Sequence, residues 1–197
     1  MKMKWLMFVG GCLIAAAGSV QAEDAKLVAD FNTPAPNNVG GNFGAFGPEN
    51  EDGNSCKQEI DENVKHGDGG ASLRLDYNVS KKGVFNGFWM KLGPSDNGNN
   101  FDATGFSKLS FWIKGDEKSG IPSKFKVEVK GDSGPVAKRY VGELKDKWIK
   151  VEIPLQEFQK QGADLAKLNE FCIVFEQSQA GAVTVGAINI DDIVLEK

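Results

Sequence analysis

The chain has 197 residues, with 23 lysines and arginines against 27 aspartates and glutamates, and its formal net charge is −4. This length is enough for one domain with its own core, and 13 phenylalanines argue against a disordered chain. The acidic balance gives no support to nucleic-acid binding, which needs a basic face. Because His66 is the only histidine, a Ser–His–Asp triad and the usual zinc sites are also poorly supported.

Residues 1–22 have the composition of a secretory signal peptide. Lys2 and Lys4 precede an apolar run, which is followed by small residues at the positions that signal peptidase recognises. We expect cleavage before Glu23 and an exported protein, either periplasmic or secreted. The run is too short to span a membrane, and no later segment is apolar enough, so the mature chain should have no membrane span. A lipoprotein signal with Cys12 as the lipidated residue is a less favoured alternative.

The rest of the chain alternates apolar and polar side chains in short segments separated by Gly, Asn, Asp and Pro. Alternation with a period of two residues is typical of strands that bury one face. In chain order, the predicted strands are 27–31, 72–79, 87–92, 108–115, 124–131, 148–155, 170–176 and 185–196. Only 154–168 has helical spacing, and Gly162 interrupts it, so one or two short helical turns are expected there.

This order of segments favours one fold class. No β–α–β alternation occurs, so a parallel sheet is not expected. About eight antiparallel strands with one short helical segment predict an all-β, two-sheet antiparallel sandwich of the jelly-roll type. Because no linker or internal repeat interrupts residues 23–197, we expect a single module, and we expect it to be a monomer.

Several of these segments resemble those of the galactose-binding-like β-sandwich superfamily. They are LVADFN, NNVGGNFGAF, GGASLRLDY, FNGFWMKL, FDATGFSKLSFWIKGD, DKWIKVEIPLQEF and INIDDIVLEK. The series is most similar to family-11-type carbohydrate-binding modules, and it also resembles the complex I intermediate-associated protein family. The first resemblance implies a non-catalytic glycan binder, often with a structural calcium ion. The second implies a sandwich that contacts another protein, since one fold serves several functions.

The calcium ion that the resemblance implies would join the first strand to the last. Asp30 and Asn32 end the first predicted strand, and Asp191 and Asp192 lie in the last one. Calcium takes several oxygen ligands from carboxylates, amides and backbone carbonyls. These four residues are therefore the calcium candidates, and the alternative is that Asp191 and Asp192 belong to a solvated strand edge.

Two tryptophans have the opposite parity to the apolar residues of their strands. Trp89 lies between Phe88 and Met90, and Trp112 has the same relation to its own neighbours, so both indoles should face outward. Flat aromatic rings stack on the apolar faces of sugars, while nearby charged groups bind the hydroxyls. The predicted glycan site consists of Trp89, Tyr140, Arg139, Trp112, Lys91 and Glu128, and Lys126 is a further candidate to bond the hydroxyls. The alternative for an outward tryptophan is that a loop or the helical segment covers it.

Two cysteines follow the predicted signal peptide. An oxidising compartment permits a disulfide between Cys56 and Cys172, and two unpaired thiols, one of them buried, are the alternative.

No acidic motif or nucleophile indicates catalysis. The favoured function is therefore an exported module that binds a polysaccharide or oligosaccharide without modifying it. The alternatives are a structural or assembly sandwich that contacts another protein and, less favoured, a small glycan-cleaving enzyme with a pair of catalytic carboxylates.

Overall fold

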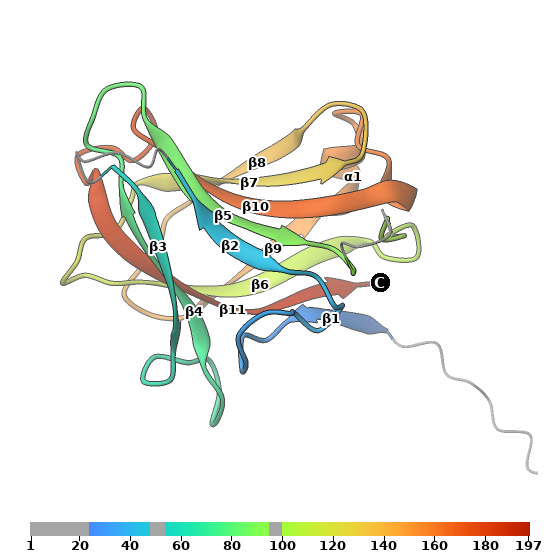
Figure 1. The fold of residues 1–197 in the computed structure, drawn as a ribbon, viewed down its shortest axis with the longest axis horizontal. Coiled ribbons are helices and arrows are strands. Elements are labelled where there is room, and N and C mark those ends of the chain that lie inside the picture. Colours follow the sequence, from blue (N-terminus) through green and yellow to red (C-terminus); the bar gives the residue numbers. More distant parts are fainter. Residues whose placement is uncertain (1–23, 48–53, 95–99) are drawn as a thin grey trace, which may run out of the picture.

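The computed structural model of the chain describes residues 24–47, 54–94 and 100–197 (Figure 1). The predicted signal peptide, residues 1–22, lies outside the described residues, as does Cys12. In the described ranges, no helix is long and apolar enough to cross a membrane.

Within those ranges the chain forms eleven strands and two short helical turns. The strands are β1 (Ala25–Ala29), β2 (Phe43–Phe46), β3 (Cys56–Asp61), β4 (Ser72–Asn78), β5 (Phe85–Lys91), β6 (Lys108–Gly115), β7 (Lys124–Gly131), β8 (Ala137–Gly142), β9 (Ile149–Pro154), β10 (Leu168–Glu176) and β11 (Val185–Glu196). The helical turns are α1 (Leu155–Gln159) and the 3-10 turn η2 (Leu165–Lys167). Each predicted strand has its counterpart, and both helical turns lie in the segment expected to hold them.

The strands form two antiparallel sheets that pack face to face (Figure 1). Sheet A has the order β3-β4-β11-β6-β9, and β1 also pairs with β11. Sheet B has the order β2-β5-β10-β7-β8. The predicted fold class, a two-sheet antiparallel sandwich with short helical turns, is confirmed.

The core lies between the two sheets and is built from the inward positions of the alternating strands. In β7, Phe125, Val127 and Val129 are buried while the residues between them are only partly covered. Tyr77 of sheet A stacks on Phe175 of sheet B, with ring centroids 4.3 Å apart and planes 14° apart. Each fully buried side chain of this kind stabilises the fold by about 1.5–3 kcal/mol. Burial of one parity in each strand fixes which side chains point outward.

The helical segment closes one end of the sandwich. Leu155 and Phe158 of α1 are buried against the core. Glu157, on the exposed side of α1, forms an ion pair with Arg139 of β8 at 3.1 Å. Gly162 follows with a φ of +94°, a backbone conformation that favours glycine and ends the turn.

Candidate binding face

The outer face of sheet B has aromatic side chains toward its two sides and charged side chains between them. In β5, Phe88 and Met90 are fully buried, so Trp89 and Lys91 point to the opposite face. The same parity applies to the two strands that follow in the sheet, β10 and β7, and to Tyr140 in β8. The charged members of this face that pair with one another, which we call the charge row, are Lys91, Glu170, Lys130, Glu128, Lys126 and Glu176.

At the Trp89 end, the charge row joins β5, β10 and β7. Nζ of Lys91 lies 2.9 Å from Oε2 of Glu170, and Nζ of Lys130 lies 2.9 Å from Oε1 of the same carboxylate. Lys91 also donates to Oδ1 of Asn169 at 2.9 Å. Burial alone would raise the pKa of Glu170, but hydrogen bonds from Lys130 and Lys91 outweigh it and lower this pKa to about 2. Glu170 is therefore ionised at neutral pH.

At the other end, the charge row reaches β8. Lys126 lies 2.8 Å from Glu128 and 2.9 Å from Glu176, and Lys130 connects the two ends at 3.7 Å from Glu128. The hydroxyl of Tyr140 donates to Oε2 of Glu176 at 2.8 Å. Burial would raise the pKa of Glu176, but the Lys126 and Tyr140 hydrogen bonds lower it overall. The donors and acceptors of the charge row are therefore bonded to one another, and these bonds fix the positions of their side chains.

A hollow of about 320 Å³ opens on this face beside Trp89. It is lined by Phe46, Trp89, Lys91, Lys130, Glu170 and Cys172. The indole of Trp89 lies over Gly44 of β2, since a Cβ added at Gly44 would be 3.0–3.1 Å from three of its ring atoms. The hollow thus combines an aromatic ring with charged groups, which is the composition of many sites for polar small ligands.

The structure brings four of the predicted glycan-site residues together and leaves two elsewhere. Trp89, Lys91, Glu128 and Tyr140 all lie on the outer face of sheet B. Arg139 has the inward parity at the edge of this sheet, opposite Val127 in register, and its guanidinium pairs with Glu157.

Trp112 lies on the outer face of sheet A. Its ring stacks on His66, with centroids 3.9 Å apart and planes 16° apart. His66 belongs to the loop between β3 and β4, and its ring also meets Trp148 edge-on at 5.8 Å. Trp112 therefore fits the alternative in which a loop covers an outward tryptophan.

Sequence reasoning missed three charged residues of the face. Glu170, Glu176 and Lys130 complete the charge row. Residues 171–175 of β10 are apolar and buried throughout, so the parity of this strand was ambiguous from the sequence. The available signal was the position of Glu170 and Glu176 at the two ends of that apolar run.

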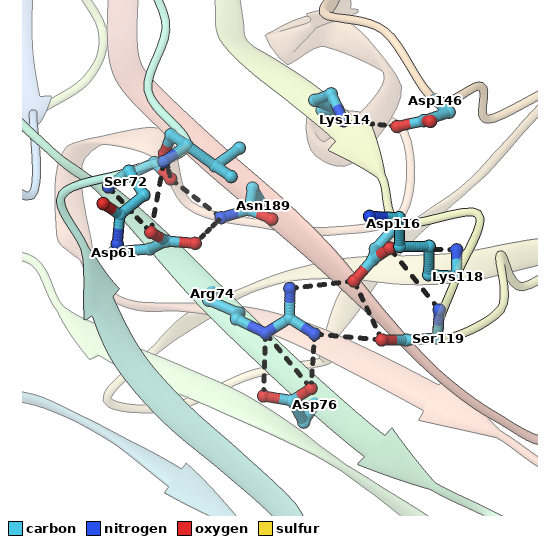
Figure 2. Close-up of polar contacts among 12 residues, drawn as sticks. Asp61, Ser72, Arg74, Asp76, Lys114, Asp116, Lys118, Ser119, Asp146 and Asn189 are labelled. Carbon is cyan, nitrogen blue, oxygen red and sulfur yellow. Dashed lines mark hydrogen bonds and ion pairs between the residues drawn. The ribbon is translucent and has the colours of Figure 1, made fainter.

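The outer face of sheet A carries a second polar network, drawn in Figure 2. Nη2 of Arg74 lies 2.8 Å from Oδ1 of Asp76, and its Nη1 lies 3.0 Å from Oδ2 of Asp116. Burial would raise the pKa of Asp116, but hydrogen bonds from Ser119 and Arg74 lower it to about 2. This network contains no aromatic side chain (Figure 2). The Arg74 guanidinium is shared between two carboxylates, so we assign this network a structural role in sheet A.

Two of the calcium candidates follow the first strand and are bonded to protein groups. Oδ2 of Asp30 accepts a hydrogen bond from Nδ2 of Asn38 at 3.2 Å, and Oδ1 accepts from the backbone of Asn32 at 3.2 Å. The side-chain oxygen of Asn32 in turn accepts from the backbone of Ala71 at 2.9 Å. All three candidate oxygens are therefore engaged by protein donors.

The other two calcium candidates are bonded to the histidine loop. Asp191 accepts from the backbone of His66 at 3.0 Å, and Oδ2 of Asp192 lies 2.9 Å from Nδ1 of His66. Burial raises the pKa of Asp191 to about 6. Across the described part of the chain, no group of three or more His, Cys, Asp or Glu side chains is arranged to hold a metal ion. Calcium therefore stays a prediction from the sequence.

Cys56 and Cys172 are buried free thiols, so the structure agrees with the alternative of two unpaired thiols and not with the disulfide. Cys56 begins β3 in sheet A, and Cys172 lies in β10 of sheet B on the outer parity, beside Trp89 in register. Burial raises the pKa of each thiol to about 12. Neither thiol is ionised at neutral pH, so neither is a nucleophile of the face.

The comparison with protein families decides what kind of module this is. The model named Carbohydrate binding domain 30 matches residues 36–197. The chain belongs to this family. The resemblance to galactose-binding-like carbohydrate-binding modules is thereby confirmed, and the protein is a carbohydrate-binding module, a class that is typically non-catalytic. No curated protein sequence matches the chain significantly.

Solved structures of carbohydrate-binding modules share the fold. A family 11 module from Clostridium thermocellum, in complex with a β-1,3-1,4-mixed-linked tetrasaccharide, has a TM-score of 0.63 and 18% identity over 89% of this chain and 97% of its own. A family 30 module has a TM-score of 0.60 and 17% identity over 87% of this chain and 99% of its own. Caldicellulosiruptor saccharolyticus CBM27-1, in complex with mannohexaose, has a TM-score of 0.56 and 16% identity over 89% and 98%.

Proposed function

We propose that this carbohydrate-binding module binds a polysaccharide chain on the outer face of sheet B and does not cleave it. The observation that carries the proposal is the half-exposed indole of Trp89, which lies over Gly44 at the edge of a hollow with charged groups. A flat ring in such a position stacks on the apolar face of a sugar, while the charge row supplies donors and acceptors for the hydroxyls.

Tyr140, the second aromatic residue of this face, sets the length of the proposed site. Tyr140 lies on β8, three interstrand spacings from Trp89 on β5, in the order β5-β10-β7-β8. At about 4.8 Å per spacing, the two strands are about 14 Å apart. A linear oligosaccharide that crosses the strands would therefore meet Trp89, the charge row and Tyr140 in turn. Two structures of similar fold are described with linear ligands, a mixed-linked tetrasaccharide and mannohexaose, which supports a linear ligand here.

We also propose that the protein is exported and acts as a monomer. The signal-peptide pattern of residues 1–22 supports export, since an exported module would reach polysaccharides outside the cell.

Native affinity electrophoresis with soluble polysaccharides tests the proposal. We expect at least one polysaccharide to retard the protein, and Trp89→Ala to weaken that affinity at least about tenfold through the loss of stacking and apolar contact. Trp112→Ala, on the opposite sheet, is the matched control and should bind like the wild type once circular dichroism shows that it is folded. Absence of retardation across the panel, or full retention by Trp89→Ala, would overturn the proposed face. Shortening of the polysaccharide would indicate an enzyme.

A further inference from the structure

The charge row exposes its cations more than its anions at the Trp89 end. The side chains of Lys91 and Lys130 are 32% and 33% exposed, whereas Glu170 between them is 17% exposed. Glu128, the next carboxylate along the row, is 13% exposed. A ligand that enters the hollow beside Trp89 therefore meets ammonium groups before it meets carboxylates.

The hollow also carries an excess of positive charge. Its charged lining consists of two ammonium groups, Lys91 and Lys130, against one carboxylate, Glu170. Cys172, which also lines it, is a neutral thiol at physiological pH because burial raises its pKa to about 12. This local sign is opposite to that of the whole chain, whose formal net charge is −4. The cationic lining is thus a property of this site and not of the surface in general.

The ion pair of Lys126 and Glu176, near Tyr140, has the reverse relation. Lys126 is 11% exposed, and its partner Glu176 is 24% exposed. Lys138 of β8 has the same outward parity as Tyr140 and is exposed, so the Tyr140 end also offers a cation. Exposed lysines on this face suit a ligand that carries carboxylates, and the hollow beside Trp89 places Lys91 and Lys130 next to an aromatic ring.

The ammonium groups retain donors for such a ligand. An ammonium has three N–H donors. Among the described residues, Lys91 directs two of them to Glu170 and Asn169. Lys130 directs one to Glu170 at 2.9 Å and also interacts with the Cys172 side chain, with a weaker contact to Glu128 at 3.7 Å. Lys91 therefore keeps one N–H for an anionic oxygen, and Lys130 has one N–H with only the long contact to Glu128.

Building on the proposed function, we infer that the polysaccharide bound on this face is acidic. A carboxylate of one uronic acid unit lies outward of the less exposed Glu170 and contacts Lys91 and Lys130, while the ring of that sugar stacks on Trp89. Charge-assisted hydrogen bonds from two ammonium groups then select a uronate over a neutral hexose at this position.

Affinity electrophoresis with four probes tests the inference. Alginate and polygalacturonate supply uronates, mixed-linkage β-glucan is neutral, and dextran sulfate is a polyanion without carboxylates. We expect the uronates to bind most tightly, and their affinity to fall in about 1 M sodium chloride, where the screening length is about 3 Å. Binding of neutral glucan should change little with salt.

Variants locate the contact on the face. Lys91→Gln and Lys130→Gln should each weaken uronate affinity about tenfold, as expected for one charged hydrogen bond. Lys130→Arg keeps the charge and should retain most of the affinity. Lys114→Gln is the matched control, because Lys114 pairs with Asp146 on the other side of the molecule and should not affect binding.

The outcomes separate this inference from the proposed function. Retention by neutral glucan alone, or unchanged uronate affinity in both glutamine variants, would overturn the acidic ligand and leave the binding face intact. Equal retention by dextran sulfate and the uronates would also overturn it, since the site would then respond to charge alone. Absence of retardation by every probe would overturn the proposed function itself.

Discussion

The indole of Trp89 lies over Gly44, the residue opposite it on the neighbouring strand β2. A Cβ built at Gly44 would be 3.0 Å from Cζ2 and 3.1 Å from Cε2 and Nε1 of the ring. Contacts this short require the ring to shift by a few tenths of an ångström. The backbone of Gly44 lies outside the positive-φ region, so the absence of a side chain, and not conformational freedom, is what this position requires.

We therefore expect Gly44→Ala to weaken polysaccharide binding about three- to tenfold, because the indole is displaced from its place beside the hollow. The free energy of unfolding should change by less than about 1 kcal/mol, since alanine adopts the same backbone conformation. Affinity electrophoresis and urea unfolding measure the two effects. Gly105→Ala is the control, because a Cβ there has no atom within 4 Å. Equal affinity of Gly44→Ala and the wild type would show that the position of the ring does not matter.

The Glu170 carboxylate gives the charge row a contribution to stability that depends on pH. Burial would raise the pKa of Glu170, yet Lys130 and Lys91 lower it from 4.5 to about 2 in the folded protein. A carboxyl group with a depressed folded pKa stabilises the fold above its unfolded pKa, and this contribution is lost as the pH falls from about 4.5 toward about 2.

Glu170→Gln should accordingly lose less stability on acidification than the wild type. Between about pH 6 and about pH 3, we expect the difference in the loss to be roughly 1–2 kcal/mol. Urea unfolding at the two pH values measures it. Glu117→Gln, at an exposed turn position, should lose as much stability as the wild type. The same loss in Glu170→Gln and the wild type would mean that the ion pairs of Glu170 do not stabilise the fold.

The alternation of apolar residues predicted the sandwich and most of its strands, because burial of one sheet face leaves a period-two pattern in the sequence. Three strands at the edges of the sheets have no counterpart among the eight predicted ranges. β2 (Phe43–Phe46) is short and contains a glycine, and β3 (Cys56–Asp61) exposes most of its polar residues. β8 (Ala137–Gly142) has Arg139 at an inward position. All three lack the apolar alternation that strands between two neighbours retain.

The sequence predicted individual residues of the site but not how they are arranged. Parity correctly placed Trp89 on an outer face, but it could not tell which of the two sheets each strand joins. Trp112 has the same parity, yet its strand belongs to sheet A. The contact between Lys91 and Glu170 depends on the pairing of β5 with β10, which is far away in the sequence. Long-range pairing follows from the packing of the whole fold and leaves no local signal.

Removal of the hydroxyl group should affect different properties at the two tyrosines, namely stability at Tyr77 and polysaccharide affinity at Tyr140. Tyr77 is buried and donates to the carbonyl of Val183 at 3.0 Å, whereas Tyr140 donates to Glu176 on the proposed binding face. Tyr77→Phe should lower the free energy of unfolding by about 1 kcal/mol and leave polysaccharide affinity unchanged. Tyr140→Phe should weaken affinity with a smaller effect on stability. The reverse pattern in urea unfolding and affinity electrophoresis would contradict the assignment of the two residues.

The two buried cysteines should react only when the fold opens. Cys56 and Cys172 are free, and burial raises the pKa of each to about 12, so neither is a thiolate at neutral pH. We expect iodoacetamide to modify them slowly in the folded protein and completely after unfolding in urea, as followed by mass spectrometry of their peptides. Because Cys56 and Cys172 are unpaired, a reducing agent should leave the Tm unchanged. A Cys56–Cys172 cross-linked peptide in protein prepared without reductant, together with a fall in Tm on reduction, would contradict the free thiols and favour the disulfide that an oxidising compartment permits.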